Sequence, residues 1–528
     1  MLKGLVFLGS PQEVKPNGET ATGIVIRNVA MLQRTRFRAQ VAPYLGQPVT
    51  FDGLNDIALL VVNFYRAHHH PLVDAVIPEQ DISRGTVQIV VTEFRVGAVR
   101  VEGNNWFSTG LIETAVSLHH GDTVDSRELL SDLDAANANS FRQVSLVYRP
   151  DEEPGYTDLV LHTRDRFPVR VYGGYDNSGT PVTGRSRWSL GFNWGNVLGR
   201  DQQLSYQFTS SNDFWNRRSS MYGERAGPSL VAHSLSWTTP LPSGHSLMIF
   251  GSYEQSVPNI GQHLGLVGRS GQASFRYHRH LPRTESFVQA LEVGYDFKTT
   301  DNNLDFGGTT VSHNTTEVDQ FPLTYLANFT DRWGIIDTTT MLVYSPGGVT
   351  PNNNDTAFQP APDQSGRPGA RANYLYLRSE INRLTKLPGG ATWAFRWIGQ
   401  LSNRKLLYSE QLSAGGPDIL RGYDPYAVLG DQGVVLSNEL RTPALHLLPT
   451  SLGDRQQFIA FWDYASLHNK HPVEGDGNRL HGSSIGVGLR YGIRSHLALK
   501  LDFGWPLQRL PEAQGHGQFA SISMMIGY

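Results

Sequence analysis

The stretch FASISMMIGY, residues 519–528, ends the chain and predicts its fold. Apolar side chains occupy every second position of this stretch, at Ala520, Ile522, Met524, Ile526 and Tyr528. The positions between them are mostly small or polar, with Met525 as an exception. Because successive side chains of a β-strand point to opposite faces, this alternation gives a strand with one apolar face. About ten residues of this kind, ending on an aromatic residue, are typical of a strand that crosses an outer membrane.

Similar segments fill the chain from Pro168 onward, where helical periodicity almost vanishes. We count sixteen of them, at residues 168–177, 187–195, 203–210, 231–239, 246–255, 270–280, 286–299, 316–328, 332–344, 372–384, 391–402, 433–443, 457–466, 483–493, 496–505 and 519–528. Some connections are tight, whereas 300–315 and 346–370 are long and polar. Short turns on one side and long loops on the other indicate an antiparallel outer-membrane β-barrel, and sixteen strands would enclose a channel. The alternative is a large soluble β-protein, such as a pair of sandwiches.

Composition agrees with this class and excludes several others. The 528 residues suffice for two or three domains, and the net charge of −3 gives no basic field for nucleic acid. The absence of cysteine suits a chain that crosses an oxidising periplasm unfolded. A mean hydropathy of −0.32 and the lack of a long apolar run exclude membrane helices only. The 54 glycines and 10% aromatic residues fit a membrane barrel and a soluble all-β protein equally well.

The part before Phe167 repeats one pattern twice, namely a strand, two helix-like stretches and two strands. Apolar residues recur at helical spacing in both copies, at Leu54, Ile57, Val61 and Phe64 and again at Leu129, Leu130, Leu133 and Ala136. The sequence therefore predicts two α+β modules, residues 1–94 and 95–167. Each is expected to form a three-stranded sheet whose exposed edge accepts an extended peptide as another strand. The alternative is that the modules are spacers whose edges bind nothing.

The first nine residues, MLKGLVFLG, contain an apolar run that is too short for a secretory signal. The run fits the first strand of the first module instead. We therefore expect that the printed chain lacks either its signal peptide or its true start codon.

Two short motifs in the last quarter predict a functional contact. Leu420-Arg421-Gly422-Tyr423 lies in a glycine-rich loop, and Phe461-Trp462-Asp463 lies on a predicted strand. Phe461 and Asp463 are two residues apart and so share one face. If that face lines the lumen and the loop folds back, Arg421 can pair with Asp463 through a planar two-point contact while it packs on Phe461.

The other two residues of the loop motif complete this interpretation. Gly422 would permit the bend at the tip, and Tyr423 would anchor the tip by packing. The alternatives are a solvated loop arginine for Arg421 and an ordinary lumen-facing carboxylate for Asp463.

No motif for catalysis is visible, because G-x-S-x-G, H-E-x-x-H and P-loop sequences do not occur. Histidines cluster at 68–70 and 119–120, but adjacent histidines at a helix end cannot all face one ion. We interpret them as solvated side chains. The sequence therefore predicts a protein that is not an enzyme and that holds neither a cofactor nor a metal.

The paired motifs and the two modules together resemble the two-partner secretion transporters, or TpsB proteins, of the haemolysin and filamentous-haemagglutinin type. This family lies within the wider superfamily of outer-membrane insertases, and the resemblance covers nearly the whole chain. It implies periplasmic POTRA domains over 1–94 and 95–167 and a sixteen-stranded barrel over 168–528. Residues 420–423 would form the tip of a lumen loop at about 404–432 and, with Phe461 and Asp463, a lock that fixes the loop. Leu420 departs from the family's Val or Ile.

The resemblance also implies the function. An unfolded exoprotein of the haemolysin or adhesin type would dock on the POTRA edges and pass through the barrel to the cell surface. Tyr528, Ile526 and Met524 would form the signal that the barrel-assembly machinery reads before the barrel enters the lipid. The transporter would act as a monomer. The family commonly carries a plug helix before the first module, whereas the printed sequence begins at that module's strand.

The main alternative keeps the fold and changes the function to an insertase for other barrels. Insertases of this superfamily usually carry more than two modules. A passive porin would need no periplasmic modules, and an outer-membrane enzyme would need a further catalytic domain.

Overall fold

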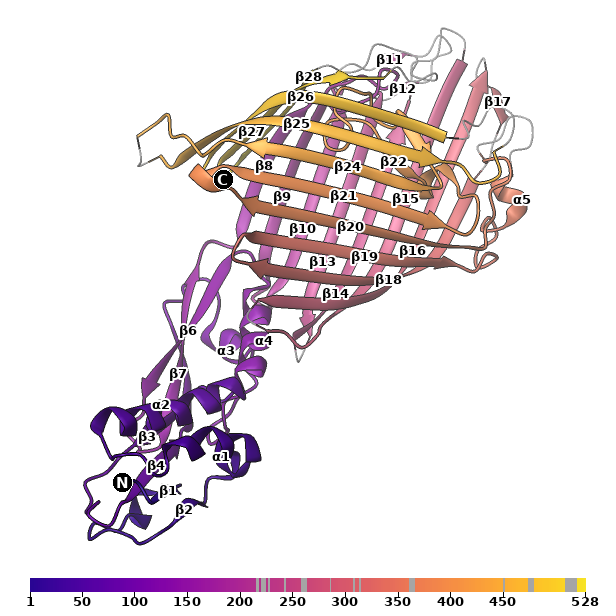
Figure 1. Ribbon diagram of the computed structural model, residues 1–528. Coiled ribbons are helices and arrows are strands. Elements are labelled where there is room, and N and C mark those ends of the chain that lie inside the picture. Colours follow the sequence, from indigo (N-terminus) through magenta and orange to yellow (C-terminus); the bar gives the residue numbers. More distant parts are fainter. Residues whose placement is uncertain are drawn as a thin grey trace. The chain divides into compact units, whose positions relative to one another are not determined.

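The computed structural model describes residues 1–214, 218–219, 225–226, 228–241, 244–257, 264–284, 286–306, 309–312, 315–359, 366–449, 452–472, 479–508 and 520–528. The chain forms two compact units (Figure 1). One is built from Met1–Arg166, and the other from Phe167–Leu241 and His245–Tyr528. Among the described residues, no helix is both long and apolar enough to cross a bilayer.

The first module has one strand more than the sequence predicted. Its elements are β1 (Gly4–Leu8), β2 (Gly23–Arg27), α1 (Thr35–Val41), α2 (Phe51–Ala67), β3 (Val73–Val76) and β4 (Thr86–Glu93). The strand order is β2-β1-β4-β3, so the expected three-stranded sheet is wrong here. The additional strand β2 pairs in parallel with β1 and covers the edge that β1 would otherwise expose. Its five residues are too few to show a clear alternation, which is why the sequence pattern did not reveal it.

The core of this module is aromatic. The ring centroids of Phe7 and Phe64 each lie 5.2 Å from that of Phe37, in edge-to-face geometry. All three side chains are buried, together with the whole of β1. Burial of each such side chain contributes about 1.5–3 kcal/mol, so β1 is held as the central strand of the sheet.

An ion pair beside β2 gives the first module a pH dependence. Arg27 donates two hydrogen bonds to Glu19, of 3.0 and 2.6 Å. These bonds hold the pKa of Glu19 below its ordinary value of 4.5. Because the folded pKa is lowered, the pair stabilises the fold above the unfolded pKa, and this contribution is lost as the pH falls through the folded pKa. We expect the hydrogen-exchange protection of the β2 amides to fall over this range in the wild type. The fall should be absent in Glu19→Gln, and an equal fall in both proteins would contradict the assignment.

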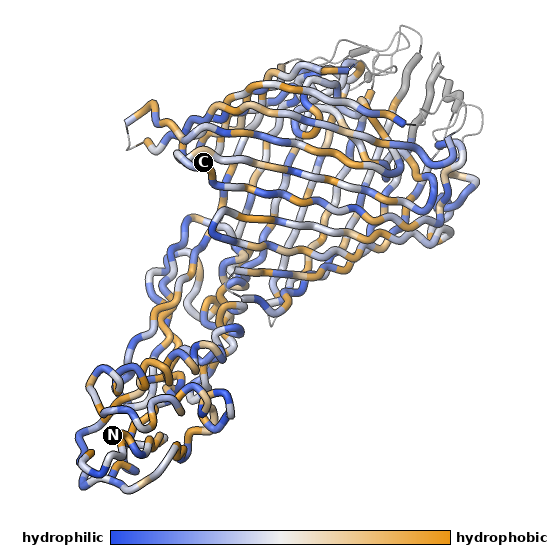
Figure 2. Tube along the Cα trace, in the orientation of Figure 1, coloured by the Kyte–Doolittle hydropathy of each residue, from blue (hydrophilic) through white to orange (hydrophobic). Residues whose placement is uncertain are grey.

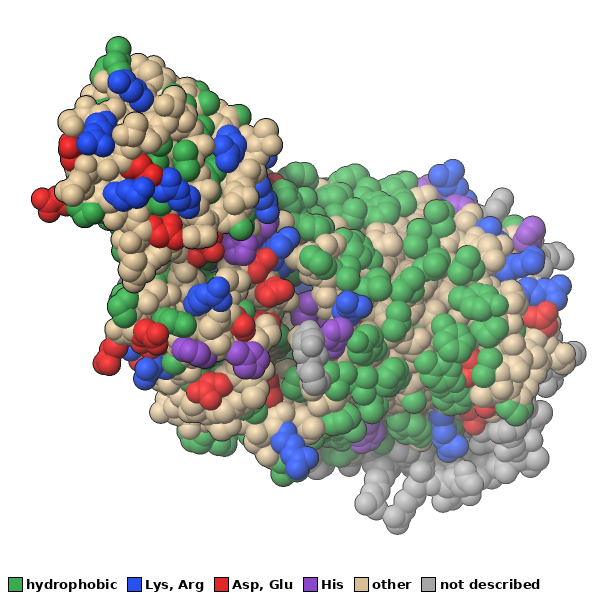
Figure 3. All heavy atoms as spheres, turned by 90° about the horizontal axis from the view of Figure 1, so that it is seen from below, with side chains coloured by type: hydrophobic (Ala, Val, Ile, Leu, Met, Phe, Trp, Pro, Cys, Tyr) green, Lys and Arg blue, Asp and Glu red, His purple; other side chains and the backbone are tan. Residues whose placement is uncertain are grey.

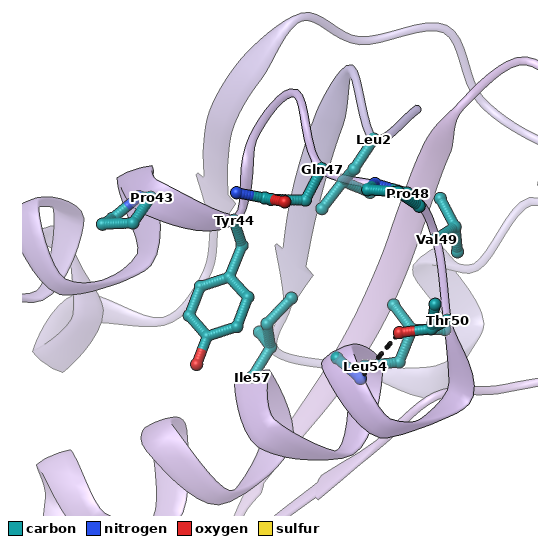
Figure 4. A pocket seen from close by; sticks show the side chains of 10 residues that line it. Leu2, Pro43, Tyr44, Gln47, Pro48, Val49, Thr50, Leu54 and Ile57 are labelled. Carbon is teal, nitrogen blue, oxygen red and sulfur yellow. Dashed lines mark hydrogen bonds between the residues drawn. The ribbon is translucent and has the colours of Figure 1, made fainter.

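A small apolar cavity of about 380 Å³ opens beside the N-terminus of α2. Its side chains come from three segments, as Figure 4 shows, and include Leu2, Tyr44, Val49, Leu54 and Ile57. Thr50 caps the helix at the cavity rim, where its Oγ accepts a hydrogen bond of 3.1 Å from the backbone N–H of Gly53. The cavity is wide enough for an apolar side chain.

The second module has the predicted strand count. It contains β5 (Arg95–Glu102), α3 (Thr109–Glu113), α4 (Ser126–Asn137), β6 (Arg142–Pro150) and β7 (Tyr156–Asp165). The strand order is β5-β7-β6. Leu129 and Ala136 of α4 are buried in its core, as the helical spacing predicted.

The second unit is a closed antiparallel barrel, and the prediction of sixteen strands is confirmed. The strands are β8 (Val169–Asp176), β9 (Arg187–Val197), β10 (Gln202–Ser211), β13 (Leu230–Leu241), β14 (His245–Ser256), β15 (Leu264–His280), β16 (Phe287–Phe306), β18 (Thr315–Asp331), β19 (Gly334–Ser345), β20 (Tyr374–Lys386), β21 (Thr392–Ser402), β24 (Gln432–Arg441), β25 (Asp454–His468), β26 (Arg479–Ile493), β27 (Leu497–Pro506) and β28 (Ala520–Gly527). Pairing of β28 with β8 closes the ring. Smaller pieces are β11 (Arg218–Ser219), β12 (Arg225–Ala226), β17 (Thr309–Ser312) and α5 (Asp355–Phe358).

Strands β15 and β16 are longer than predicted, with 17 and 20 residues. The predicted end of β16 at residue 299 is followed by the polar run TDNNLDF, which continues the strand. A polar hairpin can extend beyond the bilayer, where no lipid enforces an apolar face, so alternation does not mark its end.

An apolar belt surrounds the barrel. Residues that pair directly across neighbouring strands share a face, and one such row contains Ile249, Phe275, Phe321, Tyr344 and Leu375. All five side chains are exposed, by 38–46%. Figure 2 shows the alternation along the strands, and Figure 3 shows apolar side chains covering the barrel wall. This face is the lipid contact that the sequence pattern predicted.

Candidate functional site

The long connection between β21 and β24 folds back against the barrel wall. It contains a single turn of 3-10 helix (Tyr408–Glu410) and the small hairpin of β22 (Leu412–Ala414) and β23 (Val428–Gly430). Apolar side chains of the loop and of the wall form one buried cluster, which includes Leu412, Leu420, Tyr423, Val435, Ala465 and Leu467. Strand β25 places Ala465 and Asp463 on the same face, so this face lines the lumen and the loop lies inside the barrel. Residues 403–431 are called the lumen loop below.

Arg421 and Asp463 form a buried two-point ion pair. Arg421 donates from Nε to Oδ2 of Asp463 at 2.7 Å and from Nη2 to Oδ1 at 2.6 Å. Its backbone N–H donates to Oδ2 at 3.1 Å. Arg421 is 3% exposed and Asp463 is 0% exposed. The guanidinium carbon also lies 3.5 Å from the ring centroid of Phe461, so the cation rests on an aromatic face while its edge is paired.

The sequence interpretation missed the partners of Arg421 on β24. Nη1 donates to Glu439 at 2.5 Å, and Nη2 donates to the hydroxyl of Ser437 at 3.1 Å. That hydroxyl in turn donates to Asp463 at 2.7 Å. The strand register explains the arrangement, since Ser437 pairs with Asp463 and Glu439 pairs with Phe461. In the sequence, two polar residues at alternate positions of the neighbouring strand are the only local sign that this strand supplies partners for Arg421.

Two further arginines extend the charge network along the wall. Glu439 lies 2.7 Å from Arg441 and 3.2 Å from Arg490, and Arg490 lies 2.7 Å from Asp502. Glu439 therefore shares its charge among three guanidinium groups. These charged side chains lie on several strands and fix one another's positions through ion pairs. The carboxylates that bind Arg421 are therefore already in position on the barrel wall.

The tip of the loop approaches β27 most closely at two glycines, Gly422 and Gly504. Gly422 has a φ of 90°, which glycine adopts without strain. A Cβ at Gly504 would lie 2.7 Å from the backbone nitrogen of Gly422, and a Cβ at Gly422 would lie 2.9 Å from the carbonyl of Gly504. Both positions thus require glycine. Beside them, the Tyr423 hydroxyl lies within hydrogen-bonding distance of the carbonyl oxygens of Ser483 and Gln508, at 2.9 and 2.8 Å.

The histidine clusters do not form a site with one another. His68 ends α2, and its Nδ1 lies 2.7 Å from the carbonyl oxygen of Phe64. His120 stacks on Tyr156 with ring centroids 5.0 Å apart. Within the part of the chain that the structure describes, no group of three or more His, Cys, Asp or Glu residues could hold a metal ion.

Comparison with known families decides the identity. Residues 155–489 match the family described as haemolysin secretion/activation protein ShlB/FhaC/HecB, and residues 20–93 match the ShlB-type POTRA domain. The chain belongs to the ShlB/FhaC/HecB family. The first match spans the end of the second module and most of the barrel, including the lumen loop and Asp463.

Relatives within this ShlB/FhaC/HecB family are transporters. The outer membrane transporter CdiB-2 of Burkholderia pseudomallei is 25% identical over 85% of this chain and 73% of its own. The heme/hemopexin transporter protein HuxB of Haemophilus influenzae is 21% identical over 88% of this chain and 79% of its own. The solved structure of CdiB from Escherichia coli covers 100% of this chain and 90% of its own, with a TM-score of 0.76 and 18% identity, and shares the fold.

These findings confirm the predicted family, fold class and location. The chain is an outer-membrane transporter of the two-partner secretion type, with its POTRA domains in the periplasm. Since the modules precede β8, the start of β8 lies at the periplasmic side. The ends of β19, β21 and β25, and the starts of β20, β24 and β26, therefore all lie at the extracellular side.

Proposed function

We propose that this chain captures an unfolded exoprotein on its POTRA sheet edges and passes it through the barrel, and that Arg421 locks the lumen loop between transport events. The buried ion pair between Arg421 and Asp463 supports the proposal most directly. This ion pair fixes the lumen loop in one position in the lumen. It can open again because Arg421 lies on the loop and Asp463 lies on the barrel wall. Folding of the exoprotein outside the cell could supply the drive, since a periplasm without ATP offers no nucleotide.

Strand β6 is the edge that best fits an incoming peptide. Asn137 hydrogen-bonds both the N–H and the C=O of Val144, at 2.7 and 2.9 Å, on the side away from β7. Because backbone directions alternate, Leu146 and Tyr148 present their polar groups on that same side. Asn137 would mark one end of the docking edge, and Pro150, which has no N–H, would mark the other.

The other edges are shorter or covered. In the first module the two edge strands are β2 and β3, which have only five and four residues. In the second module the backbone of Val96 on β5 pairs with Asp122 and Gly121, at 2.9 and 2.8 Å. An exoprotein strand would therefore find its longest free run on β6.

Replacing Tyr148 by proline should reduce export strongly. Proline removes the outward N–H of an edge strand without breaking the β6–β7 ladder. Tyr148→Thr keeps the N–H and removes the ring, so it serves as the matched control. The measurement is the amount of an exoprotein encoded beside this gene, or of its N-terminal fragment, that reaches the medium.

Four strains decide between export and insertion: wild type, no transporter, Tyr148→Pro and Tyr148→Thr. Exoprotein outside the cell only with the wild type and Tyr148→Thr would support docking on β6. Equal amounts in all four strains would contradict export and direct attention to assembly defects in other barrels, which is the insertase alternative.

The last residue offers a separate test of barrel assembly. The backbone of Tyr528 pairs with Val171 at the closing seam, at 2.9 and 3.2 Å, but its side chain is 94% exposed. Tyr528→Ala should therefore keep the seam, yet lower the amount of folded barrel several-fold if the assembly machinery reads the terminal aromatic. Heat-modifiable mobility on gels measures folded barrel. Trp505→Ala, which removes another exposed aromatic, is the control; an equal loss in both variants would point to general destabilisation.

A further inference from the structure

Asp431 joins four segments at the extracellular side of the barrel. It immediately precedes β24 and is completely buried. Its Oδ1 accepts hydrogen bonds from the backbone N–H of Leu406 at 3.0 Å and from the Gln411 side chain at 3.3 Å. Its Oδ2 accepts one from the backbone N–H of Lys470 at 2.8 Å. One carboxylate thus ties together the beginning and the end of the lumen loop and the connection between β25 and β26.

Arg367 supplies the positive charge for this carboxylate. It comes from the connection between β19 and β20 and is also completely buried. Its Nη1 donates to Asp431 at 2.5 Å and to the carbonyl oxygen of Leu406 at 2.7 Å. The guanidinium carbon lies 5.5 Å from the ring centroid of Tyr408. A desolvated, hydrogen-bonded ion pair of this kind is strongly destabilised when one partner is removed, because the other charge is left buried.

Apolar packing surrounds this pair. A buried cluster joins the β19–β20 connection, the barrel wall and the start of the lumen loop, through Phe358, Ala370, Tyr374, Tyr376, Leu406 and Leu407. Glu410 adds a further tie, 2.8 Å from Lys298 on β16. Residues 406–414 and 428–431, called the neck below, are therefore closed by an ion pair, by the β22–β23 ladder and by this cluster.

We propose that Arg367 and Asp431 are positioning residues that keep the neck of the lumen loop closed, as a second anchor separate from Arg421 at the tip. The proposal rests on the proposed function, in which the lumen loop is the element that an exoprotein must pass. The described contacts of the two anchors involve different residues, so each can be weakened alone. With the neck closed, water is excluded from the extracellular part of the loop; opening the neck would admit water and ions.

Ion conductance of the purified full chain in planar lipid bilayers tests the second anchor without an exoprotein. Arg367→Gln should raise the mean conductance several-fold over wild type, and Asp431→Asn should do the same. Combination of either with Arg421→Ala should conduct more than each single variant. Wild-type conductance in both single variants, with folded barrel confirmed, would overturn the proposal.

A disulfide across the neck separates a positioning role from general loosening of the barrel. Ser413 and Leu429 pair directly on β22 and β23, at a spacing suited to a disulfide. The chain contains no cysteine, so Ser413→Cys with Leu429→Cys forms a defined bridge. When oxidised, this bridge should return Arg367→Gln to wild-type conductance, and reduction should raise the conductance again.

If the bridged Arg367→Gln variant has the same conductance in its oxidised and reduced forms, Arg367 does not act by keeping the neck closed. Arg367→Lys, which keeps the charge, repeats the experiment if Arg367→Gln does not assemble. Raised conductance of the variants, together with no export of the exoprotein by the wild type, would instead count against the proposed function and leave the neck anchor standing, so the two failures are distinguishable.

Discussion

Arg421→Ala is expected to abolish most exoprotein secretion while the barrel still assembles. The substitution leaves Asp463 fully buried without its cation and removes the strongest partner of Glu439. Breaking a buried ion pair in this way costs about 3–5 kcal/mol, so the loop tip would leave its place on the wall in most molecules. Exoprotein in the medium is the measurement, and heat-modifiable mobility establishes that the barrel has folded.

Arg421→Lys is the matched variant for this experiment. Lysine keeps the charge but cannot make the planar two-point contact with Asp463 or rest flat on Phe461. Intermediate secretion would show that geometry matters as well as charge. If Arg421→Ala secretes at the wild-type level, the lock is wrong.

Gly504→Val should displace the loop tip without changing any charge. The added Cβ would meet the backbone of Gly422 at 2.7 Å and that of Arg421 at 2.8 Å, and a rigid backbone cannot yield as a side chain can. We expect the tip to move away from β27, so that secretion falls nearly as far as with Arg421→Ala. Protease susceptibility of the lumen loop in the purified barrel should rise.

Gly251→Val is the control for strand propensity. This glycine also lies on a barrel strand, but an added Cβ meets only the carbonyl of Gln272, at 3.8 Å. Secretion should stay near the wild-type level. Equal losses with Gly251→Val and Gly504→Val would mean that valine harms the barrel itself, and the contact between the loop tip and β27 would then have no separate role.

The barrel could be predicted because each strand shows its own alternation of apolar and polar residues. Alternation along residues 519–528 depends only on which side meets lipid, and lipid meets every strand in the same way. The prediction failed where that constraint ends, as in the polar extension of β16. It also missed β2, because five residues are too few to show a clear alternation.

The candidate site could be predicted in part, for a similar reason. Arg421 and Asp463 stand in short motifs, and their pairing follows if the loop returns to the lumen. Glu439 becomes visible only through the register that sets it opposite Phe461. The pairing of Arg367 with Asp431 has no local signal at all, because the two residues are 64 positions apart and neither lies on a strand.

The short edge strands of the first module and the bonds of residues 121–122 to β5 have a consequence for a crowded membrane. Many copies of a transporter in one membrane hold their periplasmic modules at high local concentration, and open sheet edges would then join copy to copy into aggregates. Edge strands of only five and four residues in the first module, and an edge on β5 that is bonded at Val96 from within the chain, give little room for this self-association. The short free run on β6 then remains for a foreign strand, at little risk of fusing neighbouring copies.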